Sequence, residues 1–471
     1  MKLKQLQFVI IVTLVLSYGC SFFNEEINNP VKPNDLPSEY SMSASKEKPI
    51  VYCWSQSFKN EELNQLILKA LQNNFDLAAA WTKIIQSKAQ AAVAGANRWP
   101  NLSTSVDPGI TKTRTKASGT GSWTNDFSVS LMSSFEIDFW GKIRAQQQSM
   151  DYEFKATQLD YQTAMTSLIS EIVLCWIDII SQRMQKQLLQ KQLATNKTYL
   201  KLVRLRFQKG MVSSLDVYQQ QQIVESIQSQ LPLVNAQEKL NFNTLAILCG
   251  EPPQKIIPIN QKHLPTLEKF PASGIPADLL SNRPDIKASW NRLLSAKENL
   301  WAAKANQLPS ITLSASGNFQ DENISHLFDY WFIKFAGDLV MPIIDGGRRK
   351  AEANKARAVA YERAINYQNI VYKALKEVED ALVQEQHQHI LIKAIKKEKD
   401  TAQKALNEAR NRYNKGLNDY LPVLTQALAV QRLEREIIQQ EAQCIRYRIQ
   451  LYRALGGKPP IDKVSHDIFN M

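Results

Sequence analysis

The pattern of hydrophobic and polar positions predicts long β-strands in the first half of the chain. Across residues 127–139, apolar residues alternate with mostly polar ones, which is typical of a strand with one apolar face. A run of about 13 residues is long for a strand of a soluble protein. A weaker alternating segment lies at residues 102–113. We therefore expect a β-hairpin within about residues 100–140. The apolar positions of its second strand are Phe127, Val129, Leu131, Phe135, Ile137 and Phe139.

The second half of the chain repeats this pattern. Apolar residues alternate from Ile311 to Ala315 and again across residues 331–341, where Lys334 and Asp338 occupy the opposite face. A second hairpin is expected within about residues 309–343. Long strands with one apolar and one polar face favour a membrane β-barrel with a wet lumen. The alternative is a soluble β-sandwich, but no further strands are predicted that could form a second sheet.

Each predicted hairpin is followed by a very long helical segment. Residues 142–208 and 348–415 contain neither proline nor glycine, and their apolar positions recur at steps of three and four residues. This spacing is typical of helices packed side by side as in coiled coils. Shorter return helices are expected at residues 214–248 and 420–455, the first with a kink at Pro232.

The two long helices end in the same motif, Arg-x-x-x-Gly. It occurs at Arg206 to Gly210 and at Arg412 to Gly416, and the two glycines are 206 positions apart. Glycine favours the left-handed conformation that ends many helices. Each motif therefore predicts a tight reversal between antiparallel helices, at residues 209–214 and 415–419.

The return helices also carry start signals. Ser213 and Asp419 lie at matching places, three residues after the glycines, and both are expected to act as helix N-caps. Pro422 is expected in the first turn of its helix, where a missing N–H costs little.

Further matches between the halves predict a duplicated chain. Trp140-Gly141-Lys142 corresponds to Gly346-Gly347-Arg348, and both hairpins are preceded by helical segments. We expect a signal peptide at residues 1–19 and an extended, lipid-anchored segment at 20–57. A first repeat at 58–255 and a second repeat at 256–471 would complete the chain.

The N-terminus indicates export and lipidation. Lys2 and Lys4 precede a short apolar run that ends at Leu16, and Cys20 follows closely. The run is too short to cross a bilayer as a helix. Cys20 resembles the lipidated cysteine of a bacterial lipobox, and Ser21 after it is consistent with sorting to the outer membrane. The alternative is an ordinary signal peptide with an unrelated cysteine.

Composition adds little evidence for other chemistry. The formal net charge of the 471 residues is +12, but the basic residues are spread along helices, so nucleic-acid binding is not expected. His387 and His389 are two positions apart and do not share a helix face. We expect no metal, no cofactor and no enzymatic activity. Cys175, Cys249 and Cys444 are expected to be small buried hydrophobes, although a Cys249–Cys444 bridge is possible in an exported protein.

The whole pattern resembles the outer-membrane efflux proteins of the TolC type, in the branch that is lipidated. The resemblance lies in Trp99-Pro100, Phe139-Trp140-Gly141-Lys142, Asp345-Gly346-Gly347-Arg348-Arg349, both Arg-x-x-x-Gly turns and Leu455-Gly456-Gly457. It implies a mainly α fold with a transmembrane β part. A homotrimer would form a twelve-stranded β-barrel continuous with a twelve-helix periplasmic α-barrel. Such a channel is the exit duct of a tripartite efflux pump, and its partners are a periplasmic adaptor and an inner-membrane transporter.

The resemblance also implies two functional regions at the periplasmic tip. The expected gate consists of Asp216, Tyr413, Asp419, Leu421, Leu424 and Thr425. The expected adaptor contact consists of Arg204, Arg206, Gly210, Met211, Arg412, Gly416 and Leu417. The Tyr413 hydroxyl is expected to donate a hydrogen bond to Asp216, although helix capping alone also explains an aspartate there.

This chain departs from the family pattern at Asn418, Pro422 and Thr425, where some members carry charged residues. We therefore expect a gate that is less negative and more dependent on leucine packing. Three other functions stay open: a type I protein secretion duct, a structural periplasmic coiled-coil lipoprotein and a secreted hydrolase. The substrate is not predicted.

Overall fold

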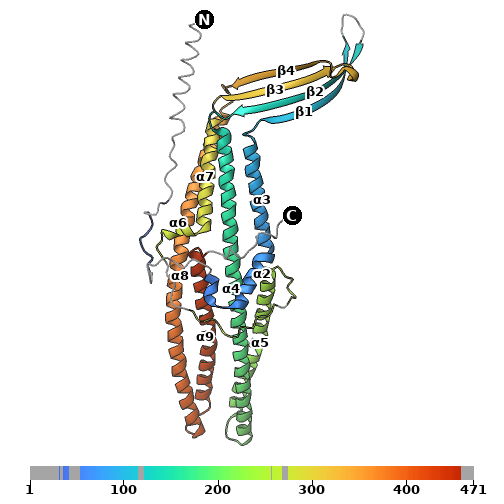
Figure 1. The fold of residues 1–471 in the computed structure, drawn as a ribbon. Coiled ribbons are helices and arrows are strands. Elements are labelled where there is room, and N and C mark those ends of the chain that lie inside the picture. The colour runs from blue at the N-terminus through green and yellow to red at the C-terminus, as the bar shows by residue number, and fades with distance from the viewer. Residues whose placement is uncertain are drawn as a thin grey trace. The chain divides into compact units, whose positions relative to one another are not determined.

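The computed structural model describes residues 31, 35–41, 54–114, 121–255, 257–267 and 274–457. The signal peptide, Cys20 and Cys53 lie outside these residues. In chain order the helices and strands (Figure 1) are η2 (Trp54–Phe58), α2 (Glu61–Asn73), α3 (Phe75–Ala96), β1 (Asn101–Arg114), β2 (Gly121–Ile137), α4 (Lys142–Gln208), α5 (Ser214–Leu248), α6 (Asp278–Asn282), α7 (Pro284–Ala305), β3 (Ser310–Asp321), η3 (Ile324–His326), β4 (Trp331–Val340), α8 (Arg348–Asn414) and α9 (Leu421–Ala454).

The described residues form two compact units, and each unit contains segments from both sequence halves. The strand unit comprises Thr82–Leu159 and Lys287–Asn369. The helical unit comprises the described parts of Val31–Trp81, Asp160–Ile286 and Ile370–Met471. The long helices α4 and α8 contribute residues to both units. The expected hairpins and long helices are therefore present.

The strand unit contains one antiparallel sheet in the order β1-β2-β3-β4. The two hairpins join through β2 and β3, where Val129 pairs with Phe319. Val106 pairs with Val129 on one side, and Phe319 pairs with Trp331 on the other. Because paired residues share a face, the register places the apolar positions of all four strands on one face. That face carries Leu102, Val106, Ile110, Phe127, Val129, Leu131, Phe135, Ile137, Ile311, Leu313, Phe319, Trp331, Ile333, Phe335 and Leu339.

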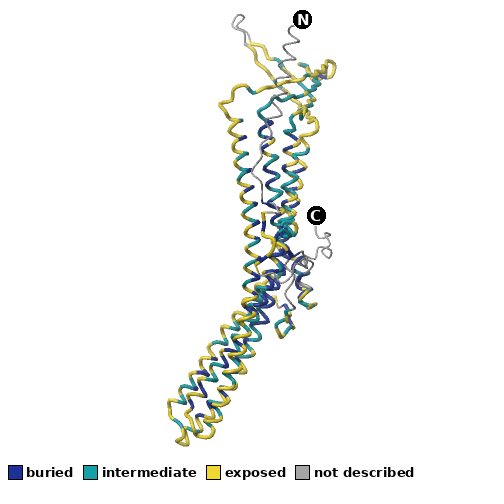
Figure 2. The backbone as a smooth tube through the Cα atoms, turned by 90° about the vertical axis from the view of Figure 1, so that its left-hand side faces the viewer, coloured by how far each residue is buried: buried dark blue, intermediate teal, exposed yellow. Residues whose placement is uncertain are grey.

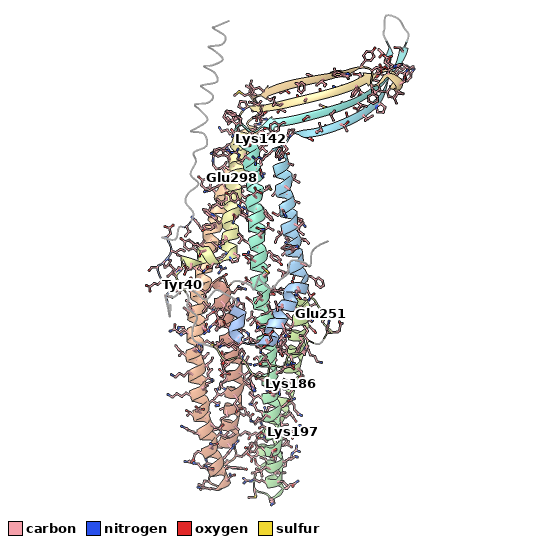
Figure 3. All side chains as sticks on the ribbon, in the orientation of Figure 1. Tyr40, Lys142, Lys186, Lys197, Glu251 and Glu298 are labelled. Carbon is pink, nitrogen blue, oxygen red and sulfur yellow. The ribbon has the colours of Figure 1, made fainter. Side chains whose placement is uncertain are left out.

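Carboxylates hold the starts of the two long helices next to the sheet. The Asp138 carboxylate accepts hydrogen bonds from the backbone N–H of Ile143 at 2.9 Å and of Arg144 at 2.8 Å. The corresponding Asp345 accepts from Gly347 at 3.0 Å and Arg349 at 3.2 Å. Each carboxylate satisfies N–H groups that the first helical turn leaves unpaired. The side chain of Lys142, at the start of α4 (Figure 3), forms an ion pair with Glu136 at 2.5 Å.

The helical unit has an apolar core between α2, α4, α5 and α9. Its centre is Trp176, which is fully buried together with Ile172, Ile180, Leu245 and Ile449. Figure 2 shows that buried positions become fewer toward the tip turns of this unit. At the margin of the core, Lys186 (Figure 3) and Arg183 on α4 form ion pairs with Glu238 on α5 at 3.3 and 3.0 Å.

The helical unit also contains the three described cysteines. Cys175, Cys249 and Cys444 are free and buried, as expected, and the possible bridge between Cys249 and Cys444 is absent. Burial raises the pKa of the Cys175 thiol to about 12 and that of Cys249 to about 11. These two side chains act as small hydrophobes. Helix α5 continues through Pro232, and the kink expected there stays a prediction.

Candidate functional site: the helix-hairpin tips

The two Arg-x-x-x-Gly motifs form tip turns with the same backbone hydrogen bonds. The N–H of Met211 donates to the carbonyl of Arg206, and the N–H of Leu417 donates to that of Arg412, both at 2.9 Å. Gly210 and Gly416 have φ values of 69° and 71°, in the left-handed region. This arrangement is the Schellman motif, which satisfies carbonyl groups at a helix end. The predicted reversals are confirmed in both halves.

The two return helices begin differently. Ser213 caps α5 as expected, and its side chain forms a capping box with Asp216. The expectation for Asp419 is wrong, because the N-cap of α9 is Tyr420, whose side chain makes no capping bond. Pro422 lies in the first turn of α9 and removes one N–H group that would need a partner. The Tyr420 side chain is therefore available for another contact.

The expected hydrogen bond from Tyr413 to Asp216 is also absent. The Asp216 carboxylate instead accepts from the Ser213 N–H at 2.9 Å and from the Ser213 hydroxyl at 2.8 Å. The Tyr413 hydroxyl is buried and has no hydrogen-bond partner among the described residues. The Tyr413 ring packs against the ring of Tyr420, with the centroids 5.3 Å apart. Asp216 is thus a helix-capping residue in this chain.

Three other contacts join the first helix hairpin, α4–α5, to the second, α8–α9. The Tyr420 hydroxyl donates a hydrogen bond to the Gln220 side-chain oxygen at 2.8 Å. The Arg206 guanidinium lies 4.4 Å from the centre of the Tyr413 ring. The Arg410 guanidinium lies 5.4 Å from the centre of the Tyr199 ring. We call these three pairs the tip seam. The cation–π pairs contribute about 0.5–1 kcal/mol each where exposed and more where buried.

The Tyr420–Gln220 hydrogen bond belongs to a buried polar chain. Gln220 is fully buried, and its amide nitrogen donates to the Asn196 backbone carbonyl at 3.1 Å and to the Asn196 side-chain oxygen at 3.2 Å. Burial is the main cause that raises the pKa of Tyr420 above its ordinary range, so the hydroxyl remains a donor at neutral pH. Separating the hairpins here would expose or leave unpaired several buried polar atoms, which is costly.

Further hydrogen bonds between the two hairpins lie along α4 and α9. The Gln192 amide nitrogen donates to the Gln431 carbonyl at 3.1 Å and to the Glu434 carboxylate at 3.0 Å. Arg435 donates to the Gln192 side-chain oxygen at 2.6 Å, and Gln185 donates to the Arg435 carbonyl at 2.7 Å. The contact between the halves is therefore polar as well as apolar.

The other expected tip residues take different positions. Arg204 donates to Gln221 at 3.3 Å, and Arg412 forms an ion pair with Glu408 at 2.8 Å, so neither contributes to the tip seam. Met211 and Leu417 are 64% and 69% exposed. Each tip turn therefore carries one exposed apolar side chain.

The expected gate residues on and beside α9 differ in their exposure to solvent. Leu424 is buried in the chain, whereas Leu421 is 53% exposed. The Thr425 hydroxyl donates to the Leu421 carbonyl at 2.9 Å. Asp419 is exposed beside the turn.

Sequence reasoning missed Gln220 and Tyr420. Gln220 is a polar residue close to the apolar positions Val217, Ile223 and Val224 of α5. A polar residue on the core face of a helix needs a buried partner, and this was a signal that could have been used. Nothing in the local sequence identifies Tyr420 as that partner, because the two residues are 200 positions apart.

The sequence profile of the outer membrane efflux protein family matches residues 66–251 and 275–457. The chain belongs to this family. It is an outer-membrane channel that serves as the exit duct of an efflux system, with a large periplasmic part. Like other outer membrane efflux proteins, it combines long helices with a small antiparallel sheet.

Named relatives span most of the chain. It is 30% identical over 413 residues to the pyoverdine export outer membrane protein OpmQ of Pseudomonas putida strain KT2440, with 86% of this chain and 87% of OpmQ covered. It is 26% identical over 479 residues to the cation efflux system protein CusC of Escherichia coli O6:H1, with 96% of this chain and 98% of CusC covered.

Solved structures share the fold. A crystal structure of CusC superimposes with a TM-score of 0.84 at 25% identity, covering 92% of this chain and 99% of that one. The structure of the outer membrane protein VceC from Vibrio cholerae gives a TM-score of 0.81 at 25% identity, with 87% and 100% covered.

Proposed function

We propose that three copies of this chain form a closed resting channel that opens when the tip seam separates. The observation that supports this proposal most directly is the buried Tyr420–Gln220 hydrogen bond between the two hairpins. A resting channel must not leak, so the contacts that close it must be strong enough to hold and weak enough to break. Three pairs of about 1 kcal/mol each meet both conditions.

The sheet supports a cyclic assembly, and the family supplies the number of copies, three. The described part of each chain supplies four strands, and β1 and β4 are the edges of this sheet. Open sheet edges are not tolerated in lipid. Cyclic assembly pairs β1 of one copy with β4 of the next, and three copies give twelve strands. The apolar face of the sheet then faces lipid.

We predict different outcomes for lysine at two neighbouring positions of β4. Phe335 is 81% exposed on the apolar face, whereas Ala336 lies on the other face, next but one to Lys334. A lysine facing lipid costs about 2–4 kcal/mol at the membrane midplane. Phe335→Lys should therefore lower the amount of trimer in the outer-membrane fraction on unheated gels, and Ala336→Lys should leave it near the parent level. Equal trimer amounts for both variants would contradict the assigned lipid face.

The tip turns are proposed to dock onto a periplasmic adaptor protein. Met211 and Leu417 supply exposed apolar surface. Arg412 and Lys415 in the same region supply charge that an acidic partner surface can pair with. These cations also suit the negative end of α8, so the apolar residues provide the sharper test.

We predict that Met211→Asp combined with Leu417→Asp reduces cross-linking of the channel to its adaptor several-fold and lowers resistance in cells. An interface carboxylate left without a partner is costly. The trimer should still form, because neither residue belongs to the core of the chain. Asn418→Asp adds a charge to the second turn without removing an apolar side chain, and should have little effect. Unchanged cross-linking in the double variant would place the adaptor contact elsewhere.

The cargo is proposed to be drugs or other toxic solutes. The relatives named above export pyoverdine or cations, and another is a toluene efflux protein of Pseudomonas putida. A deletion strain exposed to drugs, dyes, detergents and metal salts would identify the class by its lost resistance. A strain that keeps full resistance but fails to secrete a protein would indicate type I secretion instead.

Lipidation of Cys20 stays a prediction. The barrel would anchor the channel in the membrane together with the lipid, so assembly does not depend on the lipid alone. Incorporation of labelled palmitate should be lost in Cys20→Ala, while the variant still assembles but inserts less efficiently.

A further inference from the structure

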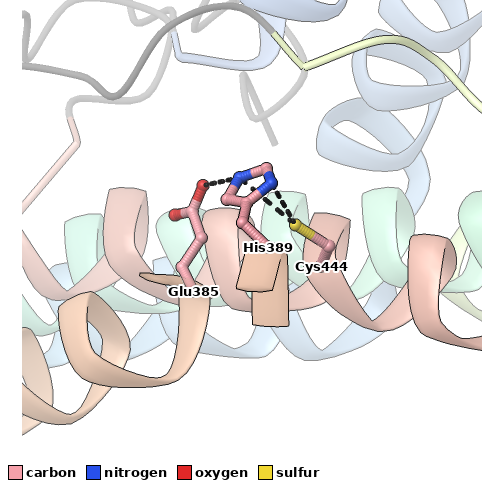
Figure 4. A group of neighbouring side chains, drawn as sticks. All are labelled: Glu385, His389 and Cys444. Atoms are coloured by element: carbon pink, nitrogen blue, oxygen red, sulfur yellow. Dashed lines mark hydrogen bonds and ion pairs between the residues drawn. The ribbon is translucent and has the colours of Figure 1, made fainter. Parts of the chain in front are cut away.

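Away from the tip seam, three side chains with metal-binding atoms meet between α8 and α9. Figure 4 shows these three side chains. Glu385 and His389 lie one turn apart on α8, and Cys444 lies opposite them on α9. His389 Nε2 is 3.6 Å from Glu385 Oε1 and 3.6 Å from Cys444 Sγ. The three ligand atoms all lie within 4.8 Å of one another. They form one group within the helical unit.

These separations suit a tetrahedral metal ion. Zn²⁺ binds carboxylate oxygen, imidazole nitrogen and thiolate sulfur at roughly 2.0–2.3 Å. Ligands of a tetrahedral ion at such distances lie roughly 3.3–3.8 Å apart. The two 3.6 Å separations from His389 Nε2 fall within this range. A small movement of the Glu385 and Cys444 side chains would complete the arrangement.

The surroundings of Glu385 also favour a ligand role. Its side chain is fully buried, and Arg448 donates to Oε1 through Nε at 2.8 Å and through Nη2 at 2.5 Å. The other oxygen, Oε2, is buried without a hydrogen-bond partner among the described residues. A buried carboxylate oxygen without a partner is costly, and a cation would satisfy it once the carboxylate turns Oε2 toward the imidazole. A metal-binding carboxylate is commonly oriented by such a neighbouring donor.

Cys444 and His389 complete the chemistry. The Cys444 thiol is free and buried, and metal binding would replace its proton. The His389 side chain is 48% exposed in the chain, which gives an ion a path from the surface.

We propose that Glu385, His389 and Cys444 bind one thiophilic divalent cation, for which Zn²⁺ is the best chemical match. Thiolate and imidazole ligands together select Zn²⁺ over Mg²⁺ or Ca²⁺. The fourth position is left to water. The ion would link α8 to α9 within the second hairpin. This site is independent of the tip seam and of the cargo.

Cobalt(II) is the probe, because its spectrum reports both geometry and sulfur ligation. We expect the purified, metal-stripped channel to bind one Co²⁺ per chain, with a thiolate-to-cobalt charge-transfer band and the visible bands of a tetrahedral ion. Added Zn²⁺ should abolish both. Cys444→Ser should remove the charge-transfer band. His389→Ala should weaken binding by at least about tenfold, the lower limit for loss of even a supporting residue.

Matched controls lie nearby in the same unit. His387→Ala changes an exposed histidine two positions away, and Cys175→Ser changes a buried cysteine that donates to the Asn241 carbonyl. Both variants should bind Co²⁺ like the parent. A channel without the charge-transfer band, or one that keeps it in Cys444→Ser, would overturn the proposal. Glu385 would then act only as the counter-ion of Arg448.

Discussion

Purified channels carrying Tyr420→Phe should show a higher resting conductance in planar lipid bilayers than the parent channel. The change removes only the hydroxyl that donates to Gln220 at 2.8 Å and keeps the ring in its apolar surroundings. A buried hydrogen bond of this kind contributes about 1 kcal/mol. Its loss should shift the closed-to-open equilibrium roughly fivefold per chain, and three copies should multiply the effect.

The control is Tyr218→Phe, which removes a hydroxyl from a tyrosine of α5 that is 68% exposed. Its conductance should equal that of the parent. Asp216→Ala with Tyr413→Phe, which the sequence alone singled out, should have a smaller effect than Tyr420→Phe. That pair loses a helix cap and a hydroxyl without a partner, but no hydrogen bond between the hairpins. Parent-like conductance in Tyr420→Phe would show that the hydrogen bond does not hold the channel closed.

The elements of the fold could be predicted because their signals are local and repeated. Alternation over residues 127–139 is explained by the sheet register, in which Phe135 pairs with Leu313 and Ile137 with Ile311. The absence of glycine and proline over 142–208 agrees with the single helix α4. Gly210 and Gly416 end their helices because few other residues adopt a positive φ without strain.

The contacts of the candidate gate could not be predicted in the same way. They join residues about 200 positions apart, so they depend on how the hairpins pack and not on local pattern. Asp216 satisfied two expectations equally well from sequence, as a cap and as an acceptor for Tyr413. In the structure Asp216 acts as a cap, because its carboxylate lies within hydrogen-bond distance of the Ser213 N–H. The Tyr413 ring packs against Tyr420 and Arg206 instead. Asp419 is not the N-cap of α9, because the turn extends one residue further and Tyr420 takes the N-cap position.

The pairing of the two β-hairpins through β2 and β3 could likewise not be predicted from the sequence. Joining β2 to β3 brings together strands from different halves. Either strand of each hairpin offers a similar apolar face, so the strand sequences alone do not decide which strands pair between the hairpins. Each compact unit likewise combines segments from both halves, and the local sequence pattern does not predict this combination.

Replacing Arg448 by Met should destabilise the purified channel by about 3–5 kcal/mol, measured as a shift in guanidinium-induced unfolding with a chelator present. Arg448 and Glu385 form an ion pair that is almost completely buried, with side chains 2% and 0% exposed. Removing the cation leaves the carboxylate without its charge partner in the core. Exchanging both residues for apolar ones, as in Arg448→Met with Glu385→Leu, should recover much of the loss.

Arg446→Met provides the matched comparison, because it makes the same change two residues earlier on α9. Arg446 pairs with Asp178 at 2.5 Å, but these side chains are 30% and 32% exposed. Water screens such a pair, so its loss should cost only about 0–1 kcal/mol. The chelator keeps any ion bound by Glu385 from contributing to the difference. If Arg448→Met costs no more than Arg446→Met, the Glu385–Arg448 pair is not the polar support of this part of the helical unit, and the packing around Trp176 alone stabilises it.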